Sequence, residues 1–371
     1  MTRTDSWRLK LLLATTATLL TLLVASLGAE VAVRYRERHR GTVPGTMPTM
    51  YYRHGRLGYA LVRDFDYFGW VHINPQGFRG TRPVSFEKEH GVIRIMAVGG
   101  STTFDSFVST DSAAWPARLE HWLERLAPGL RVEVINAGVP GYGVTQDLIR
   151  LETELYAYRP DLIILYQGHN DLFGNLKSAA GLSGVPGQRP DEVAQVTPWT
   201  AWLERHSLFY AKVAERFKLQ QFHRLRPRVD RSTPAAATID EVAANFDRTV
   251  SEYLAVAQAL GLRVVIPELV QISGSSLEET EPSRQKLWQT TVPFSNPATV
   301  LQGYQRYNLV LRDLGERYHA PFLSMVDLGI AGPDYYSPDD PIHFNDRGAD
   351  RFAEGLARQL LAGNLFPVPG P

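Results

Sequence analysis

Cysteine is absent from this chain of 371 residues. Its absence excludes disulfide bonds, thiolate metal sites and a cysteine nucleophile, but leaves the cellular compartment open. An excess of one charge is also lacking, because 39 Lys and Arg residues balance 39 Asp and Glu residues. A balanced chain has no bulk attraction to nucleic acid, and we expect no nucleic-acid partner. No spacing of His and Glu resembles a zinc site, so we expect neither a metal nor a cofactor.

One long run near the start of the chain, residues 11–29, carries no charge. It has 19 residues, mostly Leu, Ala, Thr and Val, and is long enough to cross a bilayer as a helix. A cleavable signal peptide is the alternative, because residues 24–26 and 26–28 form passable cleavage sites. Neither site is strong, so we expect an uncleaved transmembrane anchor over residues 11–33, with the membrane as its partner.

The charges beside this run divide the signal for its orientation. Basic residues lie in the tail over residues 1–10, but four arginines follow the run within residues 34–40. The positive-inside signal is therefore split. We expect a short cytoplasmic tail, a single pass through the membrane and a periplasmic location for the rest of the chain.

Residues 34–90 are predicted to form a stalk and an extended N-terminal segment. From residue 41 to about residue 90 this stretch is rich in Gly, Pro and Tyr and lacks a helical period. Residues 74–80, with the sequence Asn-Pro-Gln-Gly-Phe-Arg-Gly, are typical of a turn.

Three short apolar runs follow, and each ends in glycine and polar residues. They cover residues 93–103, 132–141 and 162–171. Continuous apolar runs bounded by turn residues are typical of buried parallel strands. Helical patterns separate the runs, and this βαβαβ alternation predicts an α/β fold with a central parallel sheet.

The later chain continues the alternation of helices and strands. A capping box at residues 238–241 begins a helix, and Asn345 is expected to cap the last one. Strands are predicted over residues 262–269 and 321–328, with a helix over 300–318 between them.

The alternation is interrupted by an insertion over residues 172–237. Within it, residues 199–228 show aromatic residues at helical spacing together with many Lys and Arg residues. We expect the aromatic stripe to pack on the α/β body, with the basic residues in solvent. The alternative is a lid over the sheet edge that lies on an anionic membrane surface.

Polar residues follow each of the first three predicted strands. Ser101 follows two glycines after the first strand, Gly141 closes the second motif, and Asn170 lies in the third. In open α/β sheets, functional residues gather beyond the carboxyl ends of the strands. Near the end of the chain, Asp340 and His343 add an acid–imidazole pair, and together these residues are the components of a serine hydrolase.

Each motif alone has a simpler explanation. A Gly-Gly-Ser turn at residues 99–101 can cradle a phosphate, and Asn170 can cap a helix. Asp340 and His343 can belong to a surface turn. The functional interpretation depends on the four motifs occurring together, in order, at predicted strand and helix boundaries.

The four motifs resemble the sequence blocks of the SGNH (GDSL-like) hydrolase superfamily. Gly-Gly-Ser-Thr at residues 99–102 is similar to block one, with Gly100 in place of the usual Asp. Residues 136–141 are similar to block two, residues 168–171 match the Gly-x-Asn-Asp of block three, and residues 340–343 match the Asp-x-x-His of block five. The resemblance implies a three-layer, flavodoxin-like fold for a hydrolase domain over residues 91–364.

The chemistry assigns a role to each residue. Ser101 is the expected nucleophile and His343 the base that accepts its proton. Asp340 is expected to orient the imidazole, with Asp339 and Asp327 as weaker alternatives. The backbone N–H groups of Ser101 and Gly141 and the side chain of Asn170 are the expected oxyanion donors.

Two classes of function follow. The first is a serine esterase that hydrolyses an acetyl or other short O-acyl ester of an envelope carbohydrate or lipid. An O-acyltransferase that modifies a polysaccharide is the alternative, because a sugar hydroxyl can replace water at the acyl-enzyme. A non-catalytic binding or assembly protein is the second class, and an eroded triad would indicate it.

Overall fold

The computed structural model describes residues 3–40, 50–179, 198–225, 238–272, 288, 291–292, 295–338 and 340–366. The chain forms two compact units. The first, here called the helical unit, consists of residues 1–42 and 196–226, and the second, the sheet unit, consists of residues 43–195 and 227–371.

The helical unit is built on the long helix α1 (Arg3–Arg40). Residues Leu9–Arg36 of this helix are long and apolar enough to cross a membrane, with a mean hydropathy of 2.0, and a signal sequence would have the same properties. The Thr and Ser hydroxyls in this stretch, from Thr15 to Ser26, donate hydrogen bonds to carbonyls three or four residues earlier. The helix thereby satisfies its own polar groups and presents an apolar surface.

Two shorter helices complete this unit, α7 (Pro198–His206) and α8 (Leu208–Leu225). They correspond to the predicted helical segment over residues 199–228, whose last residues lie outside the described part. Within the helical unit α8 contacts α1, and the packing of this segment on the α/β body stays a prediction. The carboxylate of Glu30 on α1 accepts hydrogen bonds from backbone N–H groups at the start of α8.

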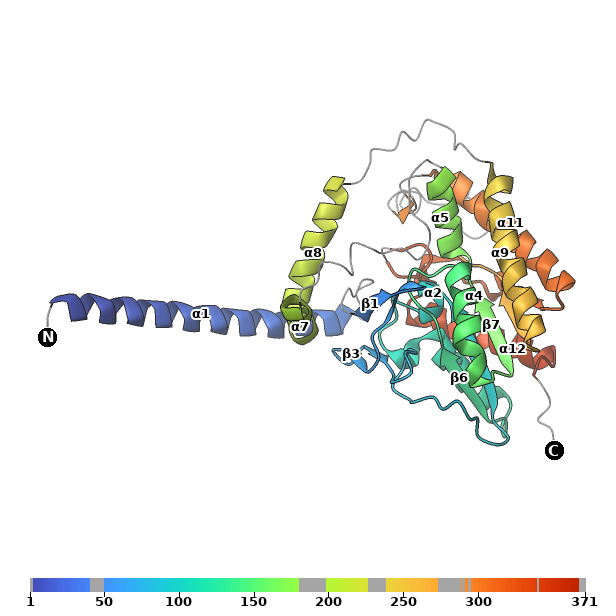
Figure 1. The fold of residues 1–371 in the computed structure, drawn as a ribbon, viewed down its shortest axis with the longest axis horizontal. Helices are drawn as coiled ribbons and strands as arrows, with labels where there is room; N and C mark the ends of the chain where they lie inside the picture. Colours follow the sequence, from blue (N-terminus) through green and yellow to red (C-terminus); the bar gives the residue numbers. More distant parts are fainter. Residues whose placement is uncertain are drawn as a thin grey trace. The chain divides into compact units, whose positions relative to one another are not determined.

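The sheet unit contains a five-stranded parallel sheet in the order β6-β5-β7-β8-β9, of which β6 and β7 are labelled in Figure 1. The two central strands pair with Ala97 opposite Ile164, and β5 pairs on its other side with Ala97 opposite Asn136. All residues of β5 and β7 are buried, as their mostly apolar sequences predict, and the one charged residue among them, Arg94 of β5, is buried as well. The strands are β5 (Ile93–Gly99), β6 (Val132–Asn136), β7 (Leu162–Tyr166), β8 (Val264–Pro267) and β9 (Phe322–Leu323).

The helices of this unit form two groups that cover the sheet. One group contains α3 and α12, which pack on each other, and the other contains α4, α5, α9 and α11. This grouping and the strand order are those of the flavodoxin-like doubly wound fold, as expected. The helices are α2 (Ser101–Phe104), α3 (Trp115–Leu126), α4 (Val144–Thr153), α5 (His169–Ala179), α9 (Ile239–Ala259), α11 (Pro297–Arg317) and α12 (Asp346–Ala362), with 3₁₀ turns η2 (Asp111–Ala113), η3 (Leu155–Tyr158), η4 (Val326–Leu328) and η5 (Pro333–Tyr335).

The predicted helix starts are confirmed where side chains cap them. The hydroxyl of Thr238 accepts from the N–H of Glu241, and the Glu241 carboxylate accepts from the N–H of Thr238, which completes the capping box of α9. The Asn345 side chain accepts from the N–H of Gly348 at the start of α12. These caps satisfy N–H groups that have no partner inside the helix.

The segment from residue 50 to residue 90 belongs to the sheet unit instead of forming a stalk. It contains two antiparallel hairpins, β1 (Tyr51–His54) with β2 (Gly58–Leu61), and β3 (Phe65–Tyr67) with β4 (Val71–Ile73). Arg79 pairs with Ile73 on one side and with Asn136 of β6 on the other, so this segment extends the sheet edge. Several of its aromatic residues, among them Tyr51, Tyr59, Phe65, Tyr67 and Phe78, are buried and contribute to the core.

Candidate active site

The turn between β5 and α2 presents Ser101 at the carboxyl edge of the sheet. Gly99 has a φ of +156°, and a Cβ there would overlap the carbonyl oxygen of Tyr166. A Cβ on Gly100 would lie 2.5 Å from the Asn170 side-chain nitrogen and 3.0 Å from the Tyr142 carbonyl oxygen. Glycine is therefore required at both positions, so that the loops that follow β6 and β7 can approach Ser101.

The imidazole of His343 lies against Ser101. Its Nε2 is 2.8 Å from the Ser101 Oγ, which is hydrogen-bond distance. Its Nδ1 is 2.9 Å from an oxygen of Asp340, although this ion pair is not aligned as a straight hydrogen bond. His343 is only 8% exposed, and the ring of Phe107 packs on it with centroids 4.6 Å apart. Serine, histidine and aspartate thus form a continuous chain of contacts.

The loop that carries His343 is shaped by Asp340. The Asp340 Oδ1 accepts hydrogen bonds from the N–H groups of Ile342 (2.8 Å) and His343 (2.9 Å). Burial opposes ionisation of Asp340, but the neighbouring imidazole and the two N–H donors keep the pKa of this carboxyl below its ordinary value. The carboxylate therefore remains charged and can hold the ring in place.

Asp327 and Asp339 were the alternatives to Asp340 as the acid that orients His343. Asp327 lies on the exposed 3₁₀ turn η4, and the described contact to the His343 Nδ1 comes from Asp340. Asp339 lies outside the described residues.

The predicted oxyanion residues lie in loops that meet at Gly100. The Asn170 side-chain nitrogen donates to the Tyr142 carbonyl oxygen at 2.8 Å, which leaves its second N–H for another acceptor. Gly141 precedes Tyr142 and has a φ of +86°, a conformation that favours glycine. As the first residue of α2, Ser101 has an N–H without a partner inside that helix.

Two residues of the N-terminal segment brace these loops, and sequence reasoning missed both. The Tyr59 hydroxyl donates to the carbonyl of Pro140, next to Gly141, at 2.7 Å. The Arg79 guanidinium is 1% exposed and donates to the carbonyls of Phe104 and Asp105 at the end of α2. In the sequence Arg79 is one residue of a predicted turn, and its burial becomes evident only in the structure.

Arg79 is itself held by charge and by an aromatic face. Its Nε lies 2.8 Å from a carboxylate oxygen of Asp111, whose other oxygen contacts His72 Nδ1 at 2.6 Å. The guanidinium carbon lies 4.8 Å from the centroid of the Phe104 ring. These contacts fix the end of the short helix that begins at Ser101.

Buried polar residues beneath the site hold together the loops that follow β6 and β7. Asp171 accepts from the N–H of Val144 at 3.1 Å, and burial raises its pKa to about 7. The neighbouring His169 is buried beside the Tyr304 hydroxyl, 2.8 Å from Nδ1, and burial lowers its pKa to about 3. A neutral imidazole packed in this way is structural and does not contact Ser101.

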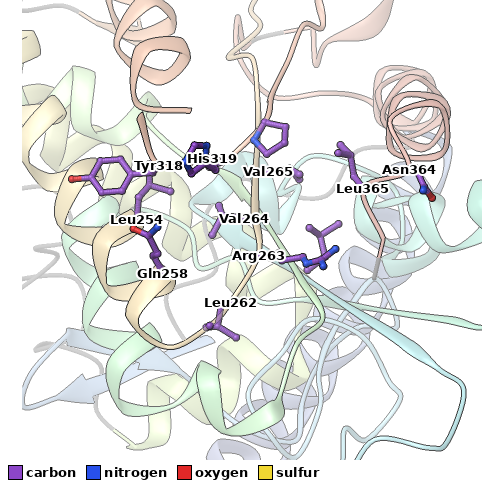
Figure 2. A pocket seen from close by; sticks show the side chains of 14 residues that line it. Leu254, Gln258, Leu262, Arg263, Val264, Val265, Tyr318, His319, Asn364 and Leu365 are labelled. Atoms are coloured by element: carbon purple, nitrogen blue, oxygen red, sulfur yellow. The ribbon is translucent and has the colours of Figure 1, made fainter. Parts of the chain in front are cut away.

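A hollow of about 420 Å³ lies at the opposite edge of the sheet (Figure 2). Its lining includes Leu162 and Val264 at the starts of β7 and β8, with Tyr318 and Leu365 beside them. Because the strands are parallel, their starts lie at the far edge from Ser101, so this hollow is not part of the Ser101 site. Among the described residues, no three His, Asp or Glu side chains form a group that could hold a metal ion.

A doubly wound parallel sheet with a Ser–His–Asp cluster at its carboxyl edge is the architecture of an α/β ester hydrolase. The model of the GDSL-like lipase/acylhydrolase family matches residues 97–351, and the chain belongs to this family. It is accordingly a carboxylic ester hydrolase with the SGNH type of fold, as the sequence blocks indicated. No curated protein sequence matches the chain.

Solved structures of related type are similar at low identity. An acetyl xylan esterase, AlAXEase, is 14% identical and has a TM-score of 0.43, with 72% of this chain and 100% of that chain covered. A lipase/acylhydrolase from Enterococcus faecalis is also 14% identical, with a TM-score of 0.43 and 73% and 96% covered. A variant of Axe2, an acetyl-xylooligosaccharide esterase from Geobacillus Stearmophilus, is 15% identical, with a TM-score of 0.42 and 74% and 96% covered.

Proposed function

We propose that this chain is a membrane-anchored serine esterase whose nucleophile is Ser101. The observation that carries the proposal is the chain of contacts from the Ser101 Oγ to the His343 Nε2 and from the His343 Nδ1 to Asp340. A serine hydroxyl is a weak nucleophile until a base accepts its proton, and imidazole suits that task near neutral pH.

The reaction proceeds in two steps. The Ser101 Oγ attacks the acyl carbon while its proton passes to the His343 Nε2, and the alcohol leaves with that proton. Water then attacks the acyl-enzyme, gives a proton to the same nitrogen, and the Ser101 Oγ recovers it as the carboxylic acid departs. The charged Asp340 stabilises the imidazolium that forms in both steps and keeps the ring in the required tautomer.

The negative charge of the tetrahedral intermediate needs donors placed in advance. The N–H groups of Ser101 and Gly141 and the free side-chain N–H of Asn170 supply them in this proposal. Gly100 supports it, because its bare Cα lets Asn170 approach the serine closely. Loss of one such donor typically costs roughly 10²–10³ in turnover.

The substrate in this proposal is an acetyl or short O-acyl ester of an envelope carbohydrate or lipid. The apolar stretch of α1 supports this location, since it can hold the catalytic unit beside the membrane. Transfer of the acyl group to a polysaccharide hydroxyl uses the same triad and is distinguished by product analysis.

The direct test is hydrolysis of 4-nitrophenyl acetate and of longer acyl esters by the full-length protein, with and without an acceptor glycan. Ser101→Ala is expected to lower turnover by about 10⁴-fold or more. A fluorophosphonate should label the wild type and not this variant. Labelling of another serine would refute the assignment, and acylated glycan in place of free acid would indicate a transferase.

Orientation and processing need a separate test. Alkaline phosphatase fused after Arg40 is expected to be active in a bacterial host, because the fusion point follows the span. Full-length protein should fractionate with membranes. An inactive fusion would contradict the periplasmic location, and a shortened protein in the soluble periplasmic fraction would show a cleaved signal peptide.

A further inference from the structure

Glu30 joins two segments of the helical unit that lie far apart in sequence. Its carboxylate accepts hydrogen bonds from the Ser207 hydroxyl and from the N–H groups of Leu208 and Phe209, each at 2.9 Å. Arg34, one turn later on α1, donates to the same carboxylate at 2.6 Å. The first turn of α8 is therefore capped by a residue of α1.

The position of Glu30 along α1 fixes the depth of this junction. Glu30 is the first charged residue after the uncharged run over residues 11–29. At ~1.5 Å per residue, this run is roughly 28 Å long, close to the thickness of the hydrocarbon layer of a bilayer. When α1 spans a membrane, Glu30 and the turn at Ser207 lie where hydrocarbon gives way to headgroups.

The helices that meet at this turn carry exposed aromatic side chains. On α7, Trp199 and Trp202 are 66% and 48% exposed and stack with ring centroids 5.3 Å apart, and His206 stacks on Trp202. On α8, Phe209 and Phe217 lie eight residues apart on one face and are 37% and 64% exposed. Exposed tryptophan is characteristic of the membrane interface, where an apolar ring and a polar N–H are both accommodated.

The charge and direction of these helices match the same surface. Residues 198–225 contain five Lys and Arg residues and two Glu residues, a balance that favours an anionic partner. Within the helical unit, α8 crosses the axis of α1 instead of running beside it (Figure 1). A helix that crosses a membrane-spanning helix at its end lies along the membrane plane.

We propose that the α7–α8 hairpin is an interfacial element that docks on an anionic phospholipid surface. Trp199, Trp202 and Phe217 enter the boundary between headgroups and acyl chains, and the basic residues contact lipid phosphates. Glu30 holds the hairpin at that depth. The inference rests on α1 as the membrane span of the proposed function, but not on the identity of the substrate or the nucleophile.

The absence of cysteine makes the test direct, because every introduced cysteine is unique. Phe217→Cys and Trp202→Cys variants of the full chain carry a nitroxide spin label in nanodiscs of phosphatidylcholine and phosphatidylglycerol. Leu19→Cys, within the apolar run, reports whether α1 spans the bilayer. Tyr156→Cys, 46% exposed in the sheet unit, is the matched control for a label in water.

Labels at residues 217 and 202 are expected to be accessible to oxygen and shielded from a water-soluble nickel chelate, at a depth shallower than residue 19. Nickel accessibility equal to that at residue 156 would overturn the proposal, and so would shielding from both reagents, which indicates packing on protein. A label at residue 19 that the nickel chelate reaches as easily as residue 156 would instead refute the membrane span, and with it the anchored form of the proposed function.

Two further arms test the details. Glu30→Ala, combined with the label at residue 217, is expected to raise nickel accessibility severalfold, because the cap on α8 is lost. An unchanged value would refute the role of Glu30. In phosphatidylcholine alone the label should move towards water, and an unchanged depth would overturn the assignment of an anionic partner.

Discussion

The two units of this chain place apolar side chains in opposite surroundings. In the sheet unit, Ile95 and Ile164 of the central strands are fully buried. In the helical unit, Leu13, Leu19 and Val31 of α1 are 60%, 67% and 68% exposed. The sheet unit therefore buries its own apolar surface, whereas the helical unit presents surface that only another apolar phase can cover.

The polar contacts differ in the same way. At the Ser101 site, loops from three strands, the N-terminal segment and the loop that carries His343 converge, and they are held by buried and part-buried hydrogen bonds. In the helical unit, one carboxylate, that of Glu30, caps α8. Catalysis on a small soluble ester should accordingly depend on contacts inside the sheet unit, and the following changes test that dependence.

The largest loss is expected at the catalytic base. His343→Ala should lower turnover of 4-nitrophenyl acetate nearly as much as loss of Ser101, by about 10⁴-fold or more, because the two residues act as one unit. Asp340→Asn should cost less, since Ser–His chemistry continues with a poorly oriented ring. Steady-state kinetics on detergent-solubilised protein measure both.

Asp327→Asn is the matched control for the acid. Asp327 is exposed on η4, and its replacement should leave turnover unchanged. A larger loss from Asp327→Asn than from Asp340→Asn would show that the orienting acid has been assigned to the wrong residue.

A smaller loss is expected from a single added methyl group. Gly100→Ala places a Cβ against the Asn170 amide, so this donor must shift and turnover should fall by roughly 10²–10³. Gly332→Ala is the control, since a Cβ there meets no atom within 4 Å and its φ of −79° suits alanine. Equal activities of the two variants would remove Asn170 from the proposed oxyanion site.

Stability should depend on pH through the buried carboxyl of Asp105. Burial raises its pKa to about 7, opposed by the Trp115 N–H and by Arg79. Between about pH 4 and pH 7 the folded protein keeps this proton and the unfolded chain does not, so stability present at low pH is lost as pH rises. The loss is about 1.4 kcal/mol per pH unit at most.

Asp105→Asn removes this titration and retains a side chain that tolerates the positive φ of 66°. Relative to the variant, the wild type should therefore lose stability from pH 4 to pH 7 and change little above that range. Melting temperatures across this range measure the difference. Asp64→Asn, at an exposed position that also has positive φ, is the control. Parallel profiles for the wild type and Asp105→Asn would contradict the prediction.

Local patterns in the sequence were sufficient for the parallel sheet and for the helix caps. The strands that end near Ser101, Gly141 and Asn170 are mostly apolar runs, and their order along the chain implies a common edge. The caps at Thr238 and Asn345 use residues within three positions of each other. Such features need no knowledge of distant contacts.

The contacts that sequence reasoning missed are long-range. Arg79 binds carbonyls 25 and 26 residues away, and Glu30 binds Leu208, 178 residues away. Neither residue lies in a periodic pattern that would indicate its partner. Extended structure was predicted in the N-terminal segment, but its pairing into two hairpins was not, because strands of three or four residues do not establish an alternation.

The smallest effect of a change inside the sheet unit is expected at Arg79. Arg79→Lys keeps the charge but loses the planar fork that reaches Asp111 and the Phe104 and Asp105 carbonyls together. The cost should be about 2 kcal/mol in the free energy of unfolding, typical of hydrogen bonds to charged groups. For a unit of about 300 residues, the melting temperature should fall by roughly 3 °C. Arg82→Lys is the matched control, because this arginine is 53% exposed and its pair with Glu120 should contribute less than about 1 kcal/mol. Because Arg79 fixes the end of the helix that begins at Ser101, its replacement should also lower turnover of 4-nitrophenyl acetate while leaving KM nearly unchanged.

A fall in melting temperature with unaltered turnover would show that Arg79 only stabilises the fold. Equal melting temperatures for Arg79→Lys and Arg82→Lys would show that the contacts of the buried arginine contribute no more to stability than those of the exposed one.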